Sequence, residues 1–356
     1  MTVPIEFAPP VAPPLARGEL APPFAWLRQP LRHPLLRPLG ALAFLLLVDL
    51  FAVPGFFHLE IKDGHLYGSL IDIANRAAPL MLAALGMTLV VATRGIDISV
   101  GAVVALAGTV GAMLVGGDAT RHLPLGLALG AAMGAALLCG AWNGVLVATL
   151  GLQPIVATLI LMVAGRGLAQ LLTDGQIVTV YYAPFFFLGS GYLLGLPFSL
   201  FVVGAVFVVT ALLMRKTALG LFLQAVGINP VAARLAGIRT AALIFFAYLF
   251  CSACAGMAGL MISSNIKSAD ANNAGLLLEL DAILAVTLGG TSLGGGKFSL
   301  AGSVIGALII QTLTYTIYSL GVPPEVNMVV KSVVVFAVCI SQSPQFGQLL
   351  RRGRRA

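Results

Sequence analysis

Long apolar segments recur along the whole sequence, and each is about the length that crosses a lipid bilayer. A transmembrane helix needs roughly 20 mostly apolar residues, and within a bilayer only helices or closed barrels satisfy every backbone hydrogen bond. Charged residues make up 9% of the 356 residues, whereas soluble domains carry roughly 25%. The sequence therefore predicts an all-α integral membrane protein with about ten transmembrane helices, some of them broken. They are expected near 38–57, 78–93, 100–116, 124–149, 154–173, 197–214, 241–264, 276–290, 300–320 and 327–342.

Lysine and arginine predict how these helices are oriented. Cytoplasmic loops of membrane proteins carry an excess of both residues. If the N-terminus is cytoplasmic, 14 of the 20 basic residues fall inside, four fall outside and two lie within spans. Both termini are therefore expected in the cytoplasm. The formal charge of +7 reflects this topology and does not indicate a nucleic-acid partner, whereas membrane lipid is an expected one.

Three regions follow from composition. Residues 1–37 are rich in Pro, Ala and Arg without a long apolar run, which favours a disordered cytoplasmic tail over a cleaved signal peptide. Residues 38–342 form the expected transmembrane domain, which contains a large cytoplasmic loop at 215–240. Residues 343–356 are expected to be a basic cytoplasmic tail.

A polar, glycine-containing stretch, residues 93–101, interrupts two long apolar runs. Charge within a membrane protein is costly, and irregular backbone there is tolerated only where protein buries it or water reaches it. Residues 93–109 also match residues 287–303 at six of 17 positions without a gap. Parallel repeats with broken helices are typical of transporters, although glycine-rich composition could produce the same identities. The stretch favours a transporter.

The cytoplasmic loop is expected to hold two short helices. Thr217 suits the start of the first and Gly227 its end, whereas Asn229 suits the N-cap, Pro230 the first position and Gly237 the C-terminal turn of the second. A helix of about two turns is not stable alone. It therefore packs on its own subunit or docks a cytoplasmic motor.

Several polar residues within or beside the spans are candidates for the translocation path or its gating. Each has a simpler alternative: Arg166 can extend toward the interface, Asn143 can join two helices, and acidic groups can stabilise a helix start. The spacing of Gly126, Gly130 and Gly134 also predicts a face that another helix approaches closely. The candidates are Arg94, Asp97, Ser99, Asn143, Arg166, Glu279 and Asp281.

No cofactor site is predicted. Residues 291–298 lack both the first glycine and the final Ser or Thr of a phosphate-binding P-loop. Cys251 and Cys254 have metal-like spacing, but no second pair or histidine accompanies them, so the cysteines are expected to act as small apolar residues. Any use of ATP must come from another subunit.

Four segments of the sequence form a specific combination of motifs. They are GIDISVG at 95–101, QPIVATLILMVAGRG at 153–167, AVGINPVAARLAGI at 225–238 and ELDAILAVTLGGTSLGGG at 279–296. Together they resemble the sugar-type permeases of bacterial ATP-binding-cassette (ABC) importers, the family of ribose and other monosaccharide systems. The resemblance covers about residues 38 to 342, and Ile98 replaces the usual leucine of its first motif. Three further segments resemble the galactofuranose-type members: residues 175–179, 269–283 and 322–335.

The resemblance implies a non-catalytic permease subunit in the bacterial inner membrane that carries a monosaccharide, such as galactofuranose, inward. The implied partners are a tandem-domain ATPase subunit, a periplasmic sugar-binding protein and a second permease, either a sister subunit or an identical copy. The ATPase would push the second loop helix and switch the path by rigid-body gating, and Asp97 would brace the change by pairing with Arg94. The implied coupling residues are Asn229, Pro230, Ala232, Ala233, Arg234 and Gly237.

Two other function classes remain as alternatives. An ion-coupled secondary sugar transporter would need acidic groups at mid-membrane depth, and Asp97, Glu279 and Asp281 are expected nearer the ends of their spans. A membrane enzyme would need a catalytic or metal cluster, and the four histidines are scattered through the tail and external loops. Both classes are less favoured than the importer permease.

Overall fold

A computed structural model describes residues 35–62, 64–116 and 123–323, with a few further positions between 326 and 336. Nearly all of the predicted N-terminal tail, most of the predicted tenth span and the whole C-terminal tail lie outside the described residues. The described part is mostly helical. Its helices are α2 Leu36–Ala52, α3 Ser69–Ala92, α4 Val100–Val115, α5 Leu125–Ala148, α6 Pro154–Leu172, α7 Ala183–Ser190, α8 Phe198–Lys216, α9 Leu219–Ile228, α10 Pro230–Leu235, α11 Thr240–Ile266, α12 Leu278–Leu288 and α13 Leu300–Ser319.

Three short antiparallel strand pairs join the helices. They are β1 Glu60–Lys62 with β2 His65–Tyr67, β3 Val178–Thr179 with β6 Ser268–Ala269, and β4 Tyr192–Leu193 with β5 Leu196–Pro197. In register, Glu60 pairs with Tyr67, Val178 with Ala269 and Tyr192 with Pro197. The β3–β6 pair links segments that are far apart in the sequence.

Each of the first nine predicted spans contains a helix. In the described part of the chain, six helices are long and apolar enough to cross a membrane: α3, α5, α6, α8, α11 and α13. The helices α2, α4 and α12 are shorter, with 17, 16 and 11 residues. The structure thus supports a multi-pass helical membrane protein with shortened helices.

The helix α3 lies at the centre of the bundle. It packs against α11, α13, α12 and α8, and 78% of its most apolar window is buried. The corresponding windows of α5, α6 and α8 are only 28%, 28% and 22% buried. Outward apolar side chains are expected where lipid replaces water, because lipid tails are as apolar as leucine.

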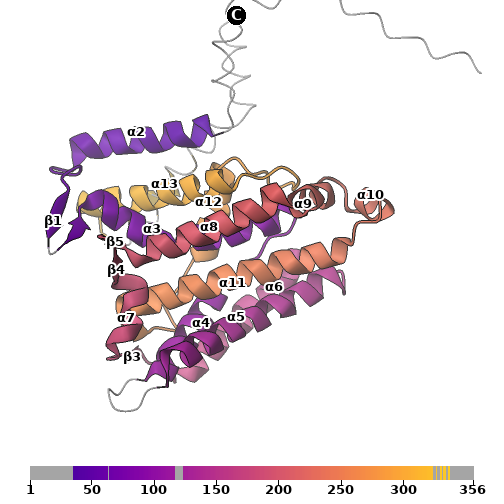
Figure 1. Ribbon diagram of the computed structural model, residues 1–356, viewed down its shortest axis with the longest axis horizontal. Coiled ribbons are helices and arrows are strands. Elements are labelled where there is room, and N and C mark those ends of the chain that lie inside the picture. Colours follow the sequence, from indigo (N-terminus) through magenta and orange to yellow (C-terminus); the bar gives the residue numbers. More distant parts are fainter. Residues whose placement is uncertain are drawn as a thin grey trace, which may run out of the picture.

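The connecting elements gather at the two ends of the bundle (Figure 1). One end holds α9 and α10, and is called the α10 end below; the opposite end holds α7, β1–β2, β3 and β4–β5, and is called the hairpin end. The loop helices predicted at 215–240 therefore lie on the side opposite the strand hairpins.

Close helix packing occurs at glycines other than the predicted ones. A Cβ atom on Gly259 of α11 would lie 2.2 Å from the Val104 carbonyl oxygen of α4, so these two helices touch along their backbones. By contrast, a Cβ atom on Gly126, Gly130 or Gly134 would meet no described atom within 4 Å. Within the described part of the chain, no helix packs closely on this glycine face.

Candidate functional site

The loop between α8 and α11, which is predicted to be cytoplasmic, forms the two short helices that its sequence predicts. Thr217 Oγ1 accepts a hydrogen bond from the Leu219 backbone N–H, at 3.2 Å, just before α9 begins. Asn229 Oδ1 accepts from the N–H groups of Val231 and Ala232, at 3.0 and 3.1 Å, and so caps α10. Gly237 has a left-handed φ of 83°, which glycine adopts without steric cost. The first helix ends at Ile228, one residue beyond the predicted Gly227.

The residues exposed on α10 differ from the coupling residues that the sequence motif implied. Ala233 is buried, with 5% of its surface exposed, so it packs on its own chain. Val231 and Leu235 are 67% and 85% exposed. Sequence reasoning missed these two side chains, which lie four residues apart and therefore on one face of the helix.

Arg94 joins three segments at the α10 end. Its Nε donates to the Gly294 carbonyl oxygen at 2.9 Å, and its Nη2 donates to the Ile228 carbonyl oxygen at the end of α9. Nearby, the Gly296 N–H donates to the Ala92 carbonyl oxygen at 2.9 Å. We call Ala92, Arg94, Ile228, Gly294 and Gly296 the Arg94 junction. The predicted pairing of Arg94 with Asp97 is wrong, because these backbone carbonyls take the guanidinium.

The same junction brings the two similar sequence segments together. Residues 93–99 connect α3 to α4, and residues 289–299 connect α12 to α13. Gly227 packs so tightly beside them that a Cβ atom there would lie 1.9 Å from the Ala92 oxygen and 2.3 Å from the Gly296 nitrogen. The end of α9 is therefore in direct contact with both connections.

Asp97, Ser99 and Asn143 form one buried cluster, called the Asp97 cluster. Ser99 donates to Asp97 Oδ1 through both Oγ, at 2.6 Å, and its backbone N–H, at 3.0 Å. Asn143 Nδ2 of α5 donates to Ser99 Oγ at 2.9 Å and to Asp97 Oδ1 at 3.4 Å. All three residues are fully buried. The cluster thus fixes the broken backbone before α4 against α5.

Arg166 fixes a second irregular segment. Its Nη1 donates to the carbonyl oxygens of Ala271 and Ala274, at 3.1 and 2.7 Å. Gly275 lies against α4, because a Cβ atom added to it would be 2.8 Å from the Gly101 carbonyl oxygen. The segment from Asp270 to Leu277 therefore runs from the end of α11 into the bundle, and does not form only an external loop.

Glu279 lies deeper than its sequence position suggested. At 1.5 Å per residue, the 11 residues of α12 span roughly 16 Å, about half of a bilayer core, and the C-terminal end of α12 lies at the α10 end. Glu279 is 4% exposed, and a Cβ atom on Gly101 would lie 2.2 Å from its Oε2. Its carboxylate is placed at the start of α4, where the helix dipole favours it. Asp281 follows, half-buried, in the first turn of α12. Glu279 is therefore enclosed between the starts of α12 and α4.

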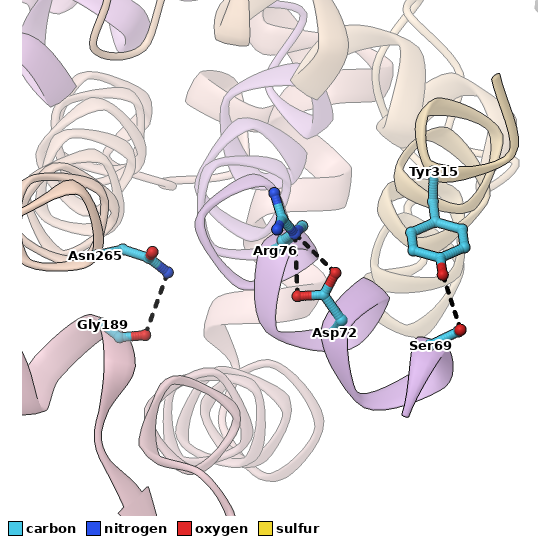
Figure 2. Close-up of polar contacts among 6 residues, drawn as sticks. All are labelled: Ser69, Asp72, Arg76, Gly189, Asn265 and Tyr315. Atoms are coloured by element: carbon cyan, nitrogen blue, oxygen red, sulfur yellow. Dashed lines mark hydrogen bonds and ion pairs between the residues drawn. The ribbon is translucent and has the colours of Figure 1, made fainter. Parts of the chain in front are cut away.

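Two adjoining hollows open beside the first turns of α3, with volumes of about 360 and 300 Å³. Asp72, Asn75 and Tyr192 line both, and the two together are called the α3 hollow. Figure 2 shows three of its polar contacts: Asp72 with Arg76, Tyr315 with Ser69, and Asn265 with the Gly189 carbonyl. The sequence prediction began this span at residue 78 and so missed a polar start that SLIDIANR at 69–76 signals.

Comparison with known proteins identifies the family to which the chain belongs. The family model described as a branched-chain amino acid transport system permease component matches residues 69–339. The chain belongs to this permease family. The match begins at α3 and includes the Arg94 junction, the Asp97 cluster and α10.

Curated relatives of the permease cover nearly its whole length. The galactofuranose transporter permease of Escherichia coli K12 is 53% identical, over 88% of this chain and 91% of the relative. The fructose import permease of Bifidobacterium longum is 39% identical, over 88% and 89%. The ribose import permease of Escherichia coli K12 is 36% identical, over 90% and 96%. No solved structure matches the chain.

Proposed function

We propose that the permease is the membrane-spanning subunit of a bacterial ABC sugar importer, that it resides in the inner membrane, and that its cargo is galactofuranose or a related monosaccharide. The observation that carries this proposal is 53% identity to a galactofuranose permease over 88% of the chain. The fructose and ribose import permeases extend the similarity to other monosaccharides. In this role the chain catalyses no covalent step.

The subunit needs three partners. These are a separate tandem-domain ATPase, a periplasmic sugar-binding protein and a second permease, either a sister subunit or an identical copy. The exposed apolar side chains of α10 support ATPase docking, because the helix caps itself through Asn229 yet leaves Val231 and Leu235 uncovered by the described chain. Arg234 is also exposed on this helix. Both termini and α10 are assigned to the cytoplasmic side.

The mechanism of coupling follows from the Arg94 junction. ATP-driven closure of the ATPase displaces α10 and the end of α9. Since Arg94 bonds the Ile228 and Gly294 carbonyls, that displacement moves the connection after α3 together with the one before α13. The Asp97 cluster and the Arg166-bound segment are the elements through which the path switches between inward and outward access. Glu279 and Asp281 are assigned to the same pathway.

Reconstitution of the full complex tests the proposal. The permease is incorporated in proteoliposomes with the ATPase, second permease and binding protein encoded beside it. ATP hydrolysis and uptake are measured with galactofuranose, ribose, fructose and leucine. We expect one sugar-loaded binding protein to stimulate both, and an ATPase variant that cannot hydrolyse ATP to abolish uptake.

Two outcomes overturn different parts of the proposal. Uptake driven by an ion gradient without the ATPase would support the secondary-transporter alternative, in which the buried Glu279 would become the coupling carboxylate. ATP-driven uptake of leucine but no sugar would leave the importer in place and overturn its cargo.

A further inference from the structure

The α3 hollow combines charged groups with no net charge. Arg76 Nε donates to both carboxylate oxygens of Asp72, at 3.0 and 2.9 Å. The two side chains are 63% and 44% exposed. Charges exposed to lipid are costly, so this opening faces water. Because Asp72 and Arg76 neutralise each other, the hollow selects neither anions nor cations.

Hydrogen-bonding groups in the hollow are only partly used. The ion pair engages Nε of Arg76, and within the described residues no hydrogen bond is made by its two terminal nitrogens. Asn75 Oδ1 accepts from Ser199 Oγ, while its Nδ2 donates to no group in the same described part. Ser69 and Tyr315 add two hydroxyls, joined at 2.8 Å. A ligand therefore meets free donors beside a carboxylate and hydroxyl acceptors.

Aromatic rings form one wall of the hollow. Tyr67 and Tyr192 both line it, with ring centroids 5.5 Å apart, and His65 stacks on Tyr192 at 4.5 Å. The strand pairs β1–β2 and β4–β5 hold these rings in place. Tyrosine presents an apolar ring with a polar end, which suits a ligand that has C–H groups on one face and hydroxyls at its edges.

We infer that the α3 hollow binds an uncharged monosaccharide. Each sugar hydroxyl donates and accepts, so it can bond the Asp72 carboxylate and the free Asn75 or Arg76 nitrogens together. Each hollow is at the small end of known ligand sites, roughly 300–1,000 Å³. This inference rests on the proposed function and places its cargo at the hairpin end before translocation.

Thiol protection tests the inference in the assembled complex of ATPase and permeases. Ser190→Cys is introduced, because Ser190 is exposed and lines the hollow without being one of the groups that bind the sugar, and its alkylation by a membrane-impermeant maleimide is timed without binding protein. Free galactofuranose, ribose, fructose and leucine are the probes. We expect at least one sugar that the complex imports to slow alkylation severalfold, and leucine to leave it unchanged. Leu194→Cys is the matched control, because Leu194 lies in the β4–β5 turn at the same end, is 88% exposed and lines neither hollow.

The outcomes separate the hollow from the importer. If the complex imports a sugar that does not protect Ser190→Cys, the hollow is not its binding site, while the proposed function stands. Protection by leucine, or equal protection of Leu194→Cys, also overturns the inference. Should Ser190→Cys not assemble, Ile266→Cys provides the same readout, because Ile266 lines the same hollow and is 48% exposed. Failure of all ATP-driven sugar uptake instead removes the proposed function.

Discussion

Arg94 is the residue whose role changes most between sequence and structure. Its two partners are carbonyl oxygens 134 and 200 residues away along the chain. The charged stretch marked Arg94 as unusual, but every residue has a carbonyl, so no sequence pattern could identify these two. The nearby Asp97 seemed the obvious partner on charge alone. In the structure, the broken backbone turns Asp97 inward to Ser99 and Asn143.

Removal of the Arg94 guanidinium is expected to uncouple ATP hydrolysis from uptake. Arg94→Asn is the suitable change, because Arg94 has a φ of 66° and asparagine tolerates that left-handed backbone. Hydrogen bonds from a charged group each contribute about 1.5–3 kcal/mol, so uptake per ATP hydrolysed should fall about tenfold or more. Arg94→Lys should be intermediate, since an ammonium lacks the planar fork.

Arg239→Asn is the control for this experiment. Arg239 is an exposed arginine at the N-cap of α11, close to α10 in the chain, and its replacement should leave the coupling ratio unchanged. An unchanged ratio in Arg94→Asn as well would show that the Arg94 junction does not transmit motion.

The Asp97 cluster is expected to contribute to stability. Asn143→Leu removes the donor to Ser99 and leaves buried polar groups without their partner, at a cost of about 1–3 kcal/mol. The detergent-solubilised complex should therefore unfold at a lower temperature. Thr149→Val, just after the same helix, breaks only an exposed bond to Val145 and should have little effect. If both variants unfold like the unmodified protein, the cluster is not a brace, and its polar groups must serve the path instead.

At the scale of helices, α10 carries the clearest prediction. Replacing both Val231 and Leu235 by aspartate should reduce co-purification of the ATPase with the permease, because the change puts charge on the exposed apolar face. Membrane insertion should be unaffected, since both side chains are outside the packed core. Leu194→Asp changes an equally exposed leucine at the hairpin end and should retain the ATPase. Normal co-purification of the double variant would place ATPase docking elsewhere.

The sequence predicted helices well where apolar length decides them and poorly where local packing does. Each of the first nine predicted ranges holds a helix, and most of the tenth lies outside the described residues. A run of apolar residues in a membrane has few alternatives to a helix. Capping also predicted α10 almost to the residue. The start of α3 was missed because its first two turns are polar, and the burial of Glu279 at the start of α12 was not predicted. Just before α12, the Arg166 side chain donates hydrogen bonds to the carbonyl oxygens of Ala271 and Ala274 and so holds this segment inside the bundle. The hydropathy of the sequence does not indicate such a contact.

For the whole molecule, orientation is the property that sequence predicts and that labelling can decide. In cells with a permeabilised outer membrane, an impermeant maleimide should modify Leu194→Cys at the hairpin end. Leu235→Cys on α10 should react only after the inner membrane is broken. The native cysteines in the described residues are buried, and the unmodified chain gives the background. Reversed labelling would place α10 outside and exclude its role with a cytoplasmic ATPase.

The Arg94 junction has a consequence for how mutations are tolerated there. Position 228 supplies only its main-chain oxygen to Arg94, so many side chains at that position leave the bond available. The preceding position is Gly227, where a single added carbon would collide with the oxygen of Ala92. Two adjacent codons should therefore differ sharply under random mutagenesis, one permissive and the other restricted to glycine. At position 228 the junction depends on where the main chain lies and not on which side chain is attached to it.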